Sequence, residues 1–483
     1  QQNIKVSTNY DVKLNGLNIG KRRWQPKSVV TEQVDATYVH NRGNFGEGVT
    51  IGFLDTGLEQ LPGLSTDLDG RDKAWGTYDA INDTVSNYGE EESGHGTHVA
   101  SIAVNSDFDV NGQIYGVAPN AAHVGIKAFD AEGKATYADV IRGIGWALQV
   151  KEQINLRVLN MSFSGPARSL YWDDPLNKAV MKAWQAGIVV VASAGNKGPD
   201  PMTIGVPGNV PYIITVGAMT DDYTSFNYSD DKVASFSSAG PTVEGFVKPD
   251  IIAPGGHISG LMSFDSQIVT EHPEFHDGGR YFEMSGTSQA AAVVSGVVAL
   301  ILTDNPALTP DQVKCRIMSS AYRGDNTDGS LRYSVFQQGA GLISAYYAIE
   351  SNNEDCANTA LDIAKDLSTI LKGMERYNHL KWCLSTVKKA KVFVIIYLAN
   401  ENAKPIYKEE IAKLLPEYSY KTIATIIDEG ISKGYYIALD PVQTKVPDKK
   451  IKNIRPSIEV IVDFYNWNID RITTVGNLIN KYK

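Results

Sequence analysis

The strongest constraint on the fold is an alternation of short apolar runs with helical segments between residues 49 and 193. The runs at 49–54, 123–129, 156–163 and 187–193 are rich in β-branched residues, as buried strands are. The segments 137–151 and 176–185 place apolar residues at helical spacing. Continuous apolar strands separated by helices predict an α/β fold with a mostly parallel sheet covered on both faces.

Polar residues follow two of these strands. Asp55 directly follows the run 49–54, and Asn196 follows the run 187–193 in a glycine-containing turn. Open α/β sheets place their chemistry at the carboxyl ends of strands. These two residues are therefore candidates for a site, although Asn196 can also be a loop-capping asparagine.

His95 and Ser288 each open a segment of small residues that we expect to be helical. The glycines on both sides of His95 suggest that one face of its ring is open to a substrate. Ser288 precedes the apolar stretch 290–302, and a helix start stabilises negative charge at a hydroxyl. A capped core helix explains Ser288 equally well, and the spacing of His95 and His98 does not favour zinc.

Four motifs together resemble the subtilase family of subtilisin-like serine peptidases. They are Asp55-Thr-Gly, Gly94-His-Gly-Thr-His, Ala194-Gly-Asn and Gly286-Thr-Ser, and they bring Asp, His and Ser into one of the known triad orders. The resemblance covers residues 28–350 and is greatest to the AprX-like branch. It implies a subtilisin-like, doubly wound sheet with helices on both faces, and serine endopeptidase activity.

The resemblance also assigns roles to individual residues. It implies that Ser288 is the nucleophile, that His95 is the general base and that Asp55 orients the imidazole. Asn196 and the backbone N–H of Ser288 would form the oxyanion hole. Two segments would pair with a protein or peptide substrate as added strands. These segments are Gly133, Lys134 and Ala135, and Ser162, Phe163 and Ser164.

Some positions carry further expectations or depart from the family pattern. Pro207 matches a cis proline beside the specificity pocket, Gln289 stands where methionine is usual, and Ser164 stands where glycine is common. The chemistry requires no cofactor. A structural calcium ion is expected at Asp107, Asp109 and Asn111, since members often bind calcium, and a solvated acidic turn is the alternative.

The C-terminal part differs in charge from the rest. The net charge of the chain is −10, but residues 351–483 contain more Lys and Arg than Asp and Glu. We therefore expect an arm at 1–27, a peptidase domain at 28–350, a linker at 351–356 and a second domain at 357–483. In this second domain we expect helices followed by a β-hairpin. The helices are expected at 359–377, 380–398, 408–415 and 419–433, the first strand of the hairpin begins at 435, and its second strand is expected at 454–458.

This second domain resembles the winged helix-turn-helix of MarR-type regulators. The resemblance implies binding of double-stranded DNA and a homodimer through this domain. Four residues would enter the major groove of the DNA: Ser419, Tyr420, Lys421 and Thr425. Four lysines would contact its phosphates: Lys445, Lys449, Lys450 and Lys452. The alternative is a domain that only dimerises or docks proteins.

Two alternatives to a cytoplasmic peptidase remain open. One is a DNA-binding or scaffolding protein whose peptidase fold is silent or only self-processing. The other is a secreted peptidase with a structural tail. Three cysteines, expected to be thiols, and the tail favour the cytoplasm, and Gln at position 1 suggests an upstream segment. The apolar runs 290–302 and 392–399 are too short to span a membrane.

Overall fold

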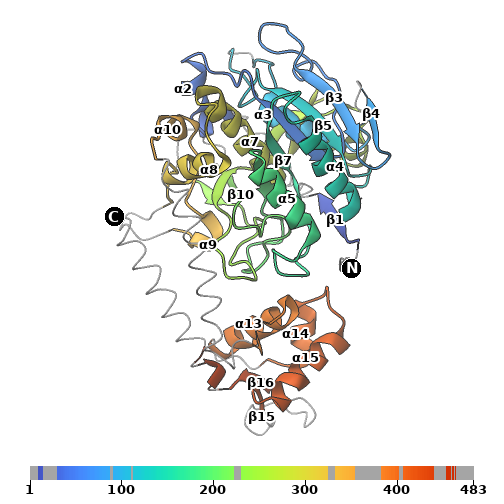
Figure 1. The fold of residues 1–483 in the computed structure, drawn as a ribbon, viewed down its shortest axis with the longest axis vertical. Helices are drawn as coiled ribbons and strands as arrows, with labels where there is room; N and C mark the ends of the chain where they lie inside the picture. Colours follow the sequence, from blue (N-terminus) through green and yellow to red (C-terminus); the bar gives the residue numbers. More distant parts are fainter. Residues whose placement is uncertain are drawn as a thin grey trace, which may run out of the picture. The chain divides into compact units, whose positions relative to one another are not determined.

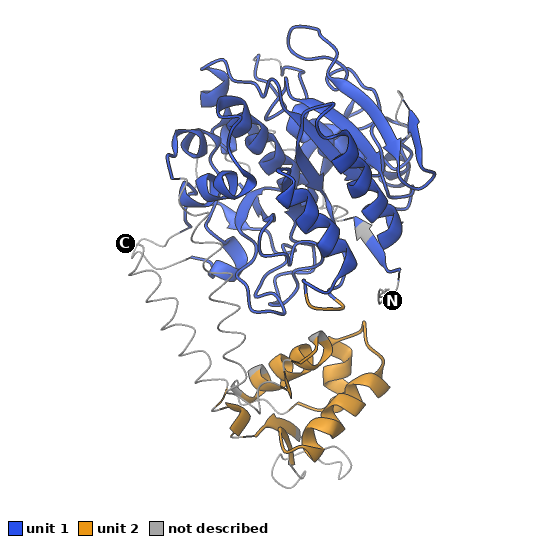
Figure 2. Ribbon diagram, in the orientation of Figure 1, with its two compact units in different colours: residues 1–167, 171–357 blue, residues 168–170, 358–483 orange. Residues whose placement is uncertain are grey.

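The chain forms two compact units in the computed structural model (Figure 2). The first comprises residues 1–167 and 171–357, and the second residues 168–170 and 358–483. The structure describes residues 9–14, 30–86, 91–109, 112–221, 230–324, 332–353, 382–383, 385–401, 406–439, 453–457, 459–461 and 463. Each unit is described by itself.

A nine-stranded sheet organises the first unit, in the order β11-β10-β9-β7-β2-β5-β3-β4, with β12 also paired to β10. The strands are β2 (Thr50–Asp55), β3 (Ala74–Asp79), β4 (Thr84–Ser86), β5 (Ala122–Lys127), β7 (Leu156–Met161), β9 (Val189–Ser193), β10 (Ile214–Thr220), β11 (Lys232–Val233) and β12 (Ile251–Pro254). All pairings are parallel except β3 with β4 and β10 with β11. The predicted mostly parallel α/β sheet is confirmed.

Helices cover both faces of this sheet (Figure 1). The helices are α1 (Val30–Gln33), α2 (Ala36–His40), α3 (His95–Val104), α4 (Tyr137–Val150), α5 (Pro175–Gln185), α6 (Gln267–Glu271), η1 (Pro273–Phe275), α7 (Thr287–Asp304), α8 (Pro310–Ser319), α9 (Val335–Gln338) and α10 (Ala345–Glu350). On one face α3 packs on α7, which contacts β7, β9 and β10; on the other α4 packs on α5. Gly143 of α4 lies against Leu54 of β2, on the face opposite Asp55.

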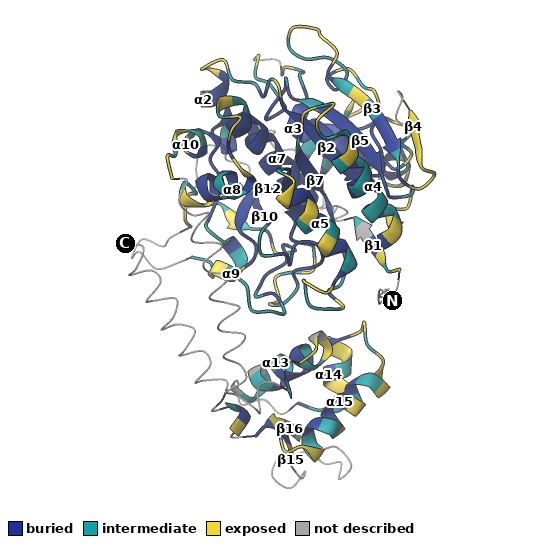
Figure 3. Ribbon diagram, viewed as in Figure 1, coloured by how far each residue is buried: buried dark blue, intermediate teal, exposed yellow. Residues whose placement is uncertain are grey.

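Helix α7 is the centre of the core (Figure 3). Every residue from Thr287 to Leu302 is buried, and Gly296 lies so close to Val117 that a side chain there would collide. Its length and apolar composition alone would allow a membrane crossing, but 89% of it is buried within the fold. The helix is apolar all round because other elements surround it.

Two smaller sheets complete the first unit. One pairs β13 (Ile258–Leu261) with β14 (Tyr281–Met284). The other has three strands in the order β6-β1-β8, where β6 is Lys134–Thr136, β8 is Phe163–Ser164 and β1 is Asp11–Leu14 of the N-terminal arm. The polar arm was expected either to pack on something else or to be partly disordered, and no strand was predicted in it.

The second unit contains three helices and a two-stranded antiparallel sheet among its described residues. The elements are α13 (Val387–Glu401), α14 (Lys408–Leu414), α15 (Tyr420–Ser432), β15 (Tyr436–Leu439) and β16 (Asn453–Pro456). Their core includes Phe393, Ile411, Ile423, Ile427 and Tyr436. The expected helix at 359–377 and the basic tip lie outside the described residues.

The cysteines differ from the expected three thiols. Cys315 is disulfide-bonded, whereas Cys383 is free and buried, and burial raises the pKa of its thiol to about 12. Disulfides persist mainly in oxidising compartments. The bonded Cys315 therefore removes one of the two arguments for a cytoplasmic protein.

Candidate active site

Asp55 and His95 meet in the interior at the carboxyl edge of the sheet. Asp55 is the last residue of β2, and His95 is the first residue of α3. His95 Nδ1 lies 2.7 Å from Asp55 Oδ1, and their side chains are 1% and 0% exposed. The carboxylate favours the tautomer with the proton on Nδ1, which leaves Nε2 as an acceptor.

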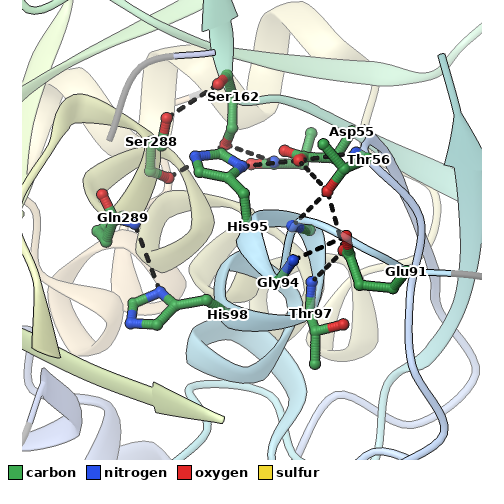
Figure 4. A network of polar contacts seen from close by, with 12 residues as sticks. Asp55, Thr56, Glu91, Gly94, His95, Thr97, His98, Ser162, Ser288 and Gln289 are labelled. Atoms are coloured by element: carbon green, nitrogen blue, oxygen red, sulfur yellow. Dashed lines mark hydrogen bonds and ion pairs between the residues drawn. The ribbon is translucent and has the colours of Figure 1, made fainter. Parts of the chain in front are cut away.

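Ser288 lies on the other side of the imidazole (Figure 4). Its Oγ donates to the carbonyl oxygen of Ser162 at 2.9 Å, and Ser162 Oγ donates to the carbonyl oxygen of Ser288 at 3.1 Å. The nucleophile candidate is therefore tied to the strand segment predicted to bind substrate. The structure brings the three residues of the predicted triad together.

Asn196 is oriented by the residue before Ser288. Its Oδ1 accepts hydrogen bonds from Thr287 N at 3.1 Å and from Thr287 Oγ1 at 2.9 Å. Because Thr287 engages the oxygen, the amide presents its Nδ2 donors to another acceptor. The arrangement places a neutral hydrogen-bond donor next to the start of α7.

The glycines beside His95 lie in close contact with neighbouring parts of the chain. Gly94 has φ of +94°, and a Cβ there would lie 2.8 Å from Met262 and Ser266. A Cβ on Gly96 would lie 2.1 Å from the carbonyl oxygen of Gly57. Gly96 therefore allows α3 to start against the backbone of Gly57, and Gly94 allows it to start against the side chains of Met262 and Ser266.

The two predicted substrate segments lie on either side of strand β1. Lys13 is opposite Lys134 on one side and Ser164 on the other, and Leu14 is opposite Phe163. Leu14 N donates to the carbonyl oxygen of Gly133 at 3.3 Å. The arm thus makes the backbone pairing that was predicted for a substrate.

Val12 anchors this strand. Its side chain is 1% exposed, and a Cβ on Gly165 would lie 2.8 Å from Val12 Cγ1. Gly165 is therefore required to be a glycine while the arm is in place. The Val206–Pro207 peptide beside this segment is cis, as the resemblance implied.

The expected calcium ligands do not fit a calcium site as they lie. Asp107 Oδ2 is 3.0 Å from Arg280 Nη2 and accepts from Tyr281 OH at 3.2 Å. Asp109 Oδ1 accepts from the backbone N of Gln113 at 2.8 Å. Asn111 lies outside the described residues. A guanidinium already balances the carboxylate of Asp107, so this loop matches the alternative of an acidic turn.

The candidate DNA-contacting residues that the structure describes lie together on α15. Ser419 caps the helix, and Tyr420, Lys421 and Thr425 are exposed with it. Tyr420 OH donates to Glu409 Oε1 at 3.1 Å, so this face also has a carboxylate. The other four predicted residues, Lys445, Lys449, Lys450 and Lys452, lie outside the described residues.

Glu91 is a residue near the site that the sequence analysis missed. Its carboxylate accepts from Thr56 Oγ1 at 2.9 Å, from Gly94 N at 2.9 Å and from Thr97 N at 3.2 Å (Figure 4). Burial raises its pKa to about 7, with a further contribution from the charge of Asp55. The sequence offers no signal that singles it out, since Glu91 stands within three consecutive glutamates at residues 90–92.

Gln289, which follows Ser288, is fully buried. Its Nε2 lies 3.4 Å from His98 Nδ1, and its Oε1 has no hydrogen-bond partner among the described residues. His98 Nε2 lies 3.0 Å from the carbonyl oxygen of Phe282, and burial lowers the pKa of His98 to about 3. Burial therefore favours the neutral form of His98.

Comparisons with known proteins agree on the first unit. A model of the subtilase family matches residues 46–341. Serine protease AprX of Bacillus subtilis (strain 168) is 41% identical over 307 residues, which span 62% of this chain and 66% of AprX, just under two thirds. Subtilisin of Bacillus pumilus is 33% identical over 323 residues, which span 66% of this chain and 97% of that protein.

Proposed function

Since this chain belongs to the subtilase family, the subtilisin-like serine endopeptidases, we propose that it cuts proteins or peptides with Ser288, His95 and Asp55 as a catalytic triad. The observation that supports this most strongly is the buried contact of 2.7 Å between His95 Nδ1 and Asp55 Oδ1, with Ser288 across the ring. No cofactor takes part in this chemistry.

The geometry suggests how the reaction proceeds. Ser288 Oγ attacks the scissile carbonyl carbon while its proton passes to His95 Nε2, and Asp55 stabilises the imidazolium. Asn196 Nδ2 and the backbone N–H of Ser288 hydrogen-bond the oxyanion. His95 then gives the proton to the leaving amine, the C–N bond breaks and water hydrolyses the acyl-enzyme by the same steps.

A substrate would bind as an added strand in the place that β1 occupies. In the antiparallel register that pairs Leu14 with Phe163, a substrate strand one residue longer would have its next residue opposite Ser162. An N–H at that position would compete for the carbonyl oxygen of Ser162, to which Ser288 Oγ donates here. Substrate binding would then release the serine hydroxyl to His95, and the residue opposite Ser162 would precede the cut.

A fluorophosphonate probe tests the proposal, because it labels only an activated serine. We expect the full chain to be labelled and to degrade casein, and Ser288→Ala to lose both. A folded parent protein that is neither labelled nor active on casein would contradict the proposal. It would favour the alternative of a silent peptidase fold.

We also propose that the second unit is a winged helix that binds double-stranded DNA. The order of two helices, α14 and α15, followed by an antiparallel pair supports this, as does the exposed group of Ser419, Lys421 and Thr425. A salt-dependent gel shift that Lys421→Ala weakens would support it. Sizing of the same sample tests the homodimer, and a dimer with no DNA shift would support the docking alternative.

A further inference from the structure

We infer that Glu91 is a positioning residue of the active site, which holds the first turn of α3 and Thr56 together and so fixes His95 against Asp55. The inference rests on the proposed function, because it takes the pair of His95 and Asp55 as catalytic. Glu91 does not reach the reacting atoms, so its effect passes through these neighbours.

The contacts of Glu91 connect two elements that are far apart in sequence. Gly94 and Thr97 belong to the start of α3, and both donate backbone N–H groups to the carboxylate. Thr56 follows β2 and donates its hydroxyl to Glu91, while its Oγ1 accepts from Gly96 N at 3.0 Å. Between them, Glu91 and Thr56 satisfy three N–H groups at the start of α3.

The same contacts hold the catalytic pair. Thr56 N donates to Asp55 Oδ1 at 2.9 Å, so the residue that Glu91 holds also orients the carboxylate. His95 lies between Gly94 and Thr97, both of which donate to Glu91. Gly96 lies so close to the carbonyl oxygen of Gly57 that a side chain there would collide, so the two elements are in close contact beside His95.

The charge of Glu91 adds to the effect of position. The ionisable group whose charge acts on Glu91 is Asp55 on β2, while Met262 and Ser266, which lie against Gly94, do not titrate in this range. A second carboxylate behind Asp55 favours the imidazolium that forms when Ser288 loses its proton. An ionised Glu91 is therefore expected to assist the reaction, and three donors stabilise that form.

Glu91→Gln removes the charge with little change of shape, and Glu91→Asp keeps the charge on a shorter side chain. With a peptide substrate, we expect Glu91→Gln to lower kcat about tenfold, since small misplacements of catalytic groups are costly, and to change KM less than twofold. The loss should be largest above pH 7, where Glu91 of the parent protein is ionised, and smaller below it, where that carboxyl is protonated as well. Glu91→Asp should lose part of kcat but keep the pH dependence of the parent.

Asp35→Asn is the matched control. Asp35 is also a buried carboxylate with hydroxyl donors, Tyr322 OH at 3.0 Å and Ser344 Oγ at 2.6 Å, but it lies between α1 and α2. We expect Asp35→Asn to lower the melting temperature and to leave kcat and the pH profile unchanged. This separates a general loss of stability from an effect on the site.

The outcomes distinguish the inference from the proposed function. An active parent protein with an unchanged kcat and pH dependence in Glu91→Gln would overturn the inference and leave the triad standing. If Glu91→Gln does not fold, an unchanged kcat in Glu91→Asp overturns it instead. A parent protein that neither cuts casein nor takes up the probe would overturn the proposed function, and the inference with it.

Discussion

Asn196 is the residue whose role is most directly set by its neighbours. Thr287 engages its Oδ1 with two hydrogen bonds, so the Nδ2 donors are oriented before a substrate arrives. Asn196→Ala removes these donors, and we expect kcat to fall about 10²–10³-fold with KM little changed. Steady-state kinetics on a peptide substrate would show this. A kcat within threefold of the parent value would exclude Asn196 from the oxyanion hole.

Gln289 lies beside the nucleophile where the family usually has methionine. Its side chain is buried, and it contains no sulfur that peroxide can oxidise. We expect Gln289→Met to lose activity in hydrogen peroxide while the parent protein keeps it. Leu300→Met is the control, because it places a buried methionine about three turns further along α7. Equal loss in the parent and in Gln289→Met would contradict the explanation.

The residues of the triad could be predicted from the sequence, whereas Glu91 could not. Asp55, His95 and Ser288 each stand at a strand end or a helix start, and glycines and small residues mark these positions locally. The partners of Glu91 come from β2 and from α3, and only the folded sheet brings them to one carboxylate. Glu91 is the middle one of three consecutive glutamates, residues 90–92, and no local pattern distinguishes it from its neighbours.

Among the elements, the strands with continuous apolar runs and the helices α4 and α5 were predicted well, whereas several other strands were missed. β2, β5, β7 and β9 lie within two residues of their expected bounds, and the run 156–163 is divided between β7 and the separate strand β8. No strand was predicted within residues 58–92, but β3 and β4 lie there, because β3 pairs with β5 and β4 pairs with β3. Strand β10, at the centre of one half of the sheet, was missed in a segment interpreted as turns.

Strand β1 shows the same dependence on partners more strongly. The arm is polar and has no periodic pattern, yet it forms a strand because β6 and β8 present unpaired backbone groups on both sides. Its only fully buried side chain among the described positions is Val12. The strand is therefore held by backbone pairing and by one apolar anchor.

We expect Val12→Asp to detach β1 and to speed the first turnovers. An aspartate has no partner in the space beside Gly165, so burying its charge is costly. Labelling by the fluorophosphonate probe, followed with time, should be faster than in the parent protein. Asp11→Asn, at an exposed position of the same strand, should label like the parent. Equal rates in all three proteins would show that the arm does not limit access.

At the scale of the whole molecule, buried histidines make the fold sensitive to acid. His123 on β5 is 3% exposed, and burial, helped by the charge of Lys73, lowers its pKa to about 3. Between pH 6.5 and about 3 the unfolded chain binds a proton at this site that the folded chain does not. The free energy of unfolding therefore decreases as the pH falls through this range.

We expect His123→Gln to reduce this loss of stability. An ordinary histidine has a pKa of about 6.5, which is about two units above pH 4.5. At about 1.4 kcal/mol per unit, this single site lowers the free energy of unfolding by about 2–3 kcal/mol at pH 4.5. Calorimetry at pH 7 and 4.5 should therefore give a smaller drop in melting temperature for the variant, whatever its stability at pH 7. The drop should not vanish, because His98 titrates in the same direction. His272→Gln, at a partly exposed position, should keep the slope of the parent. The same slope in His123→Gln as in the parent would mean that acid acts on the fold through other groups.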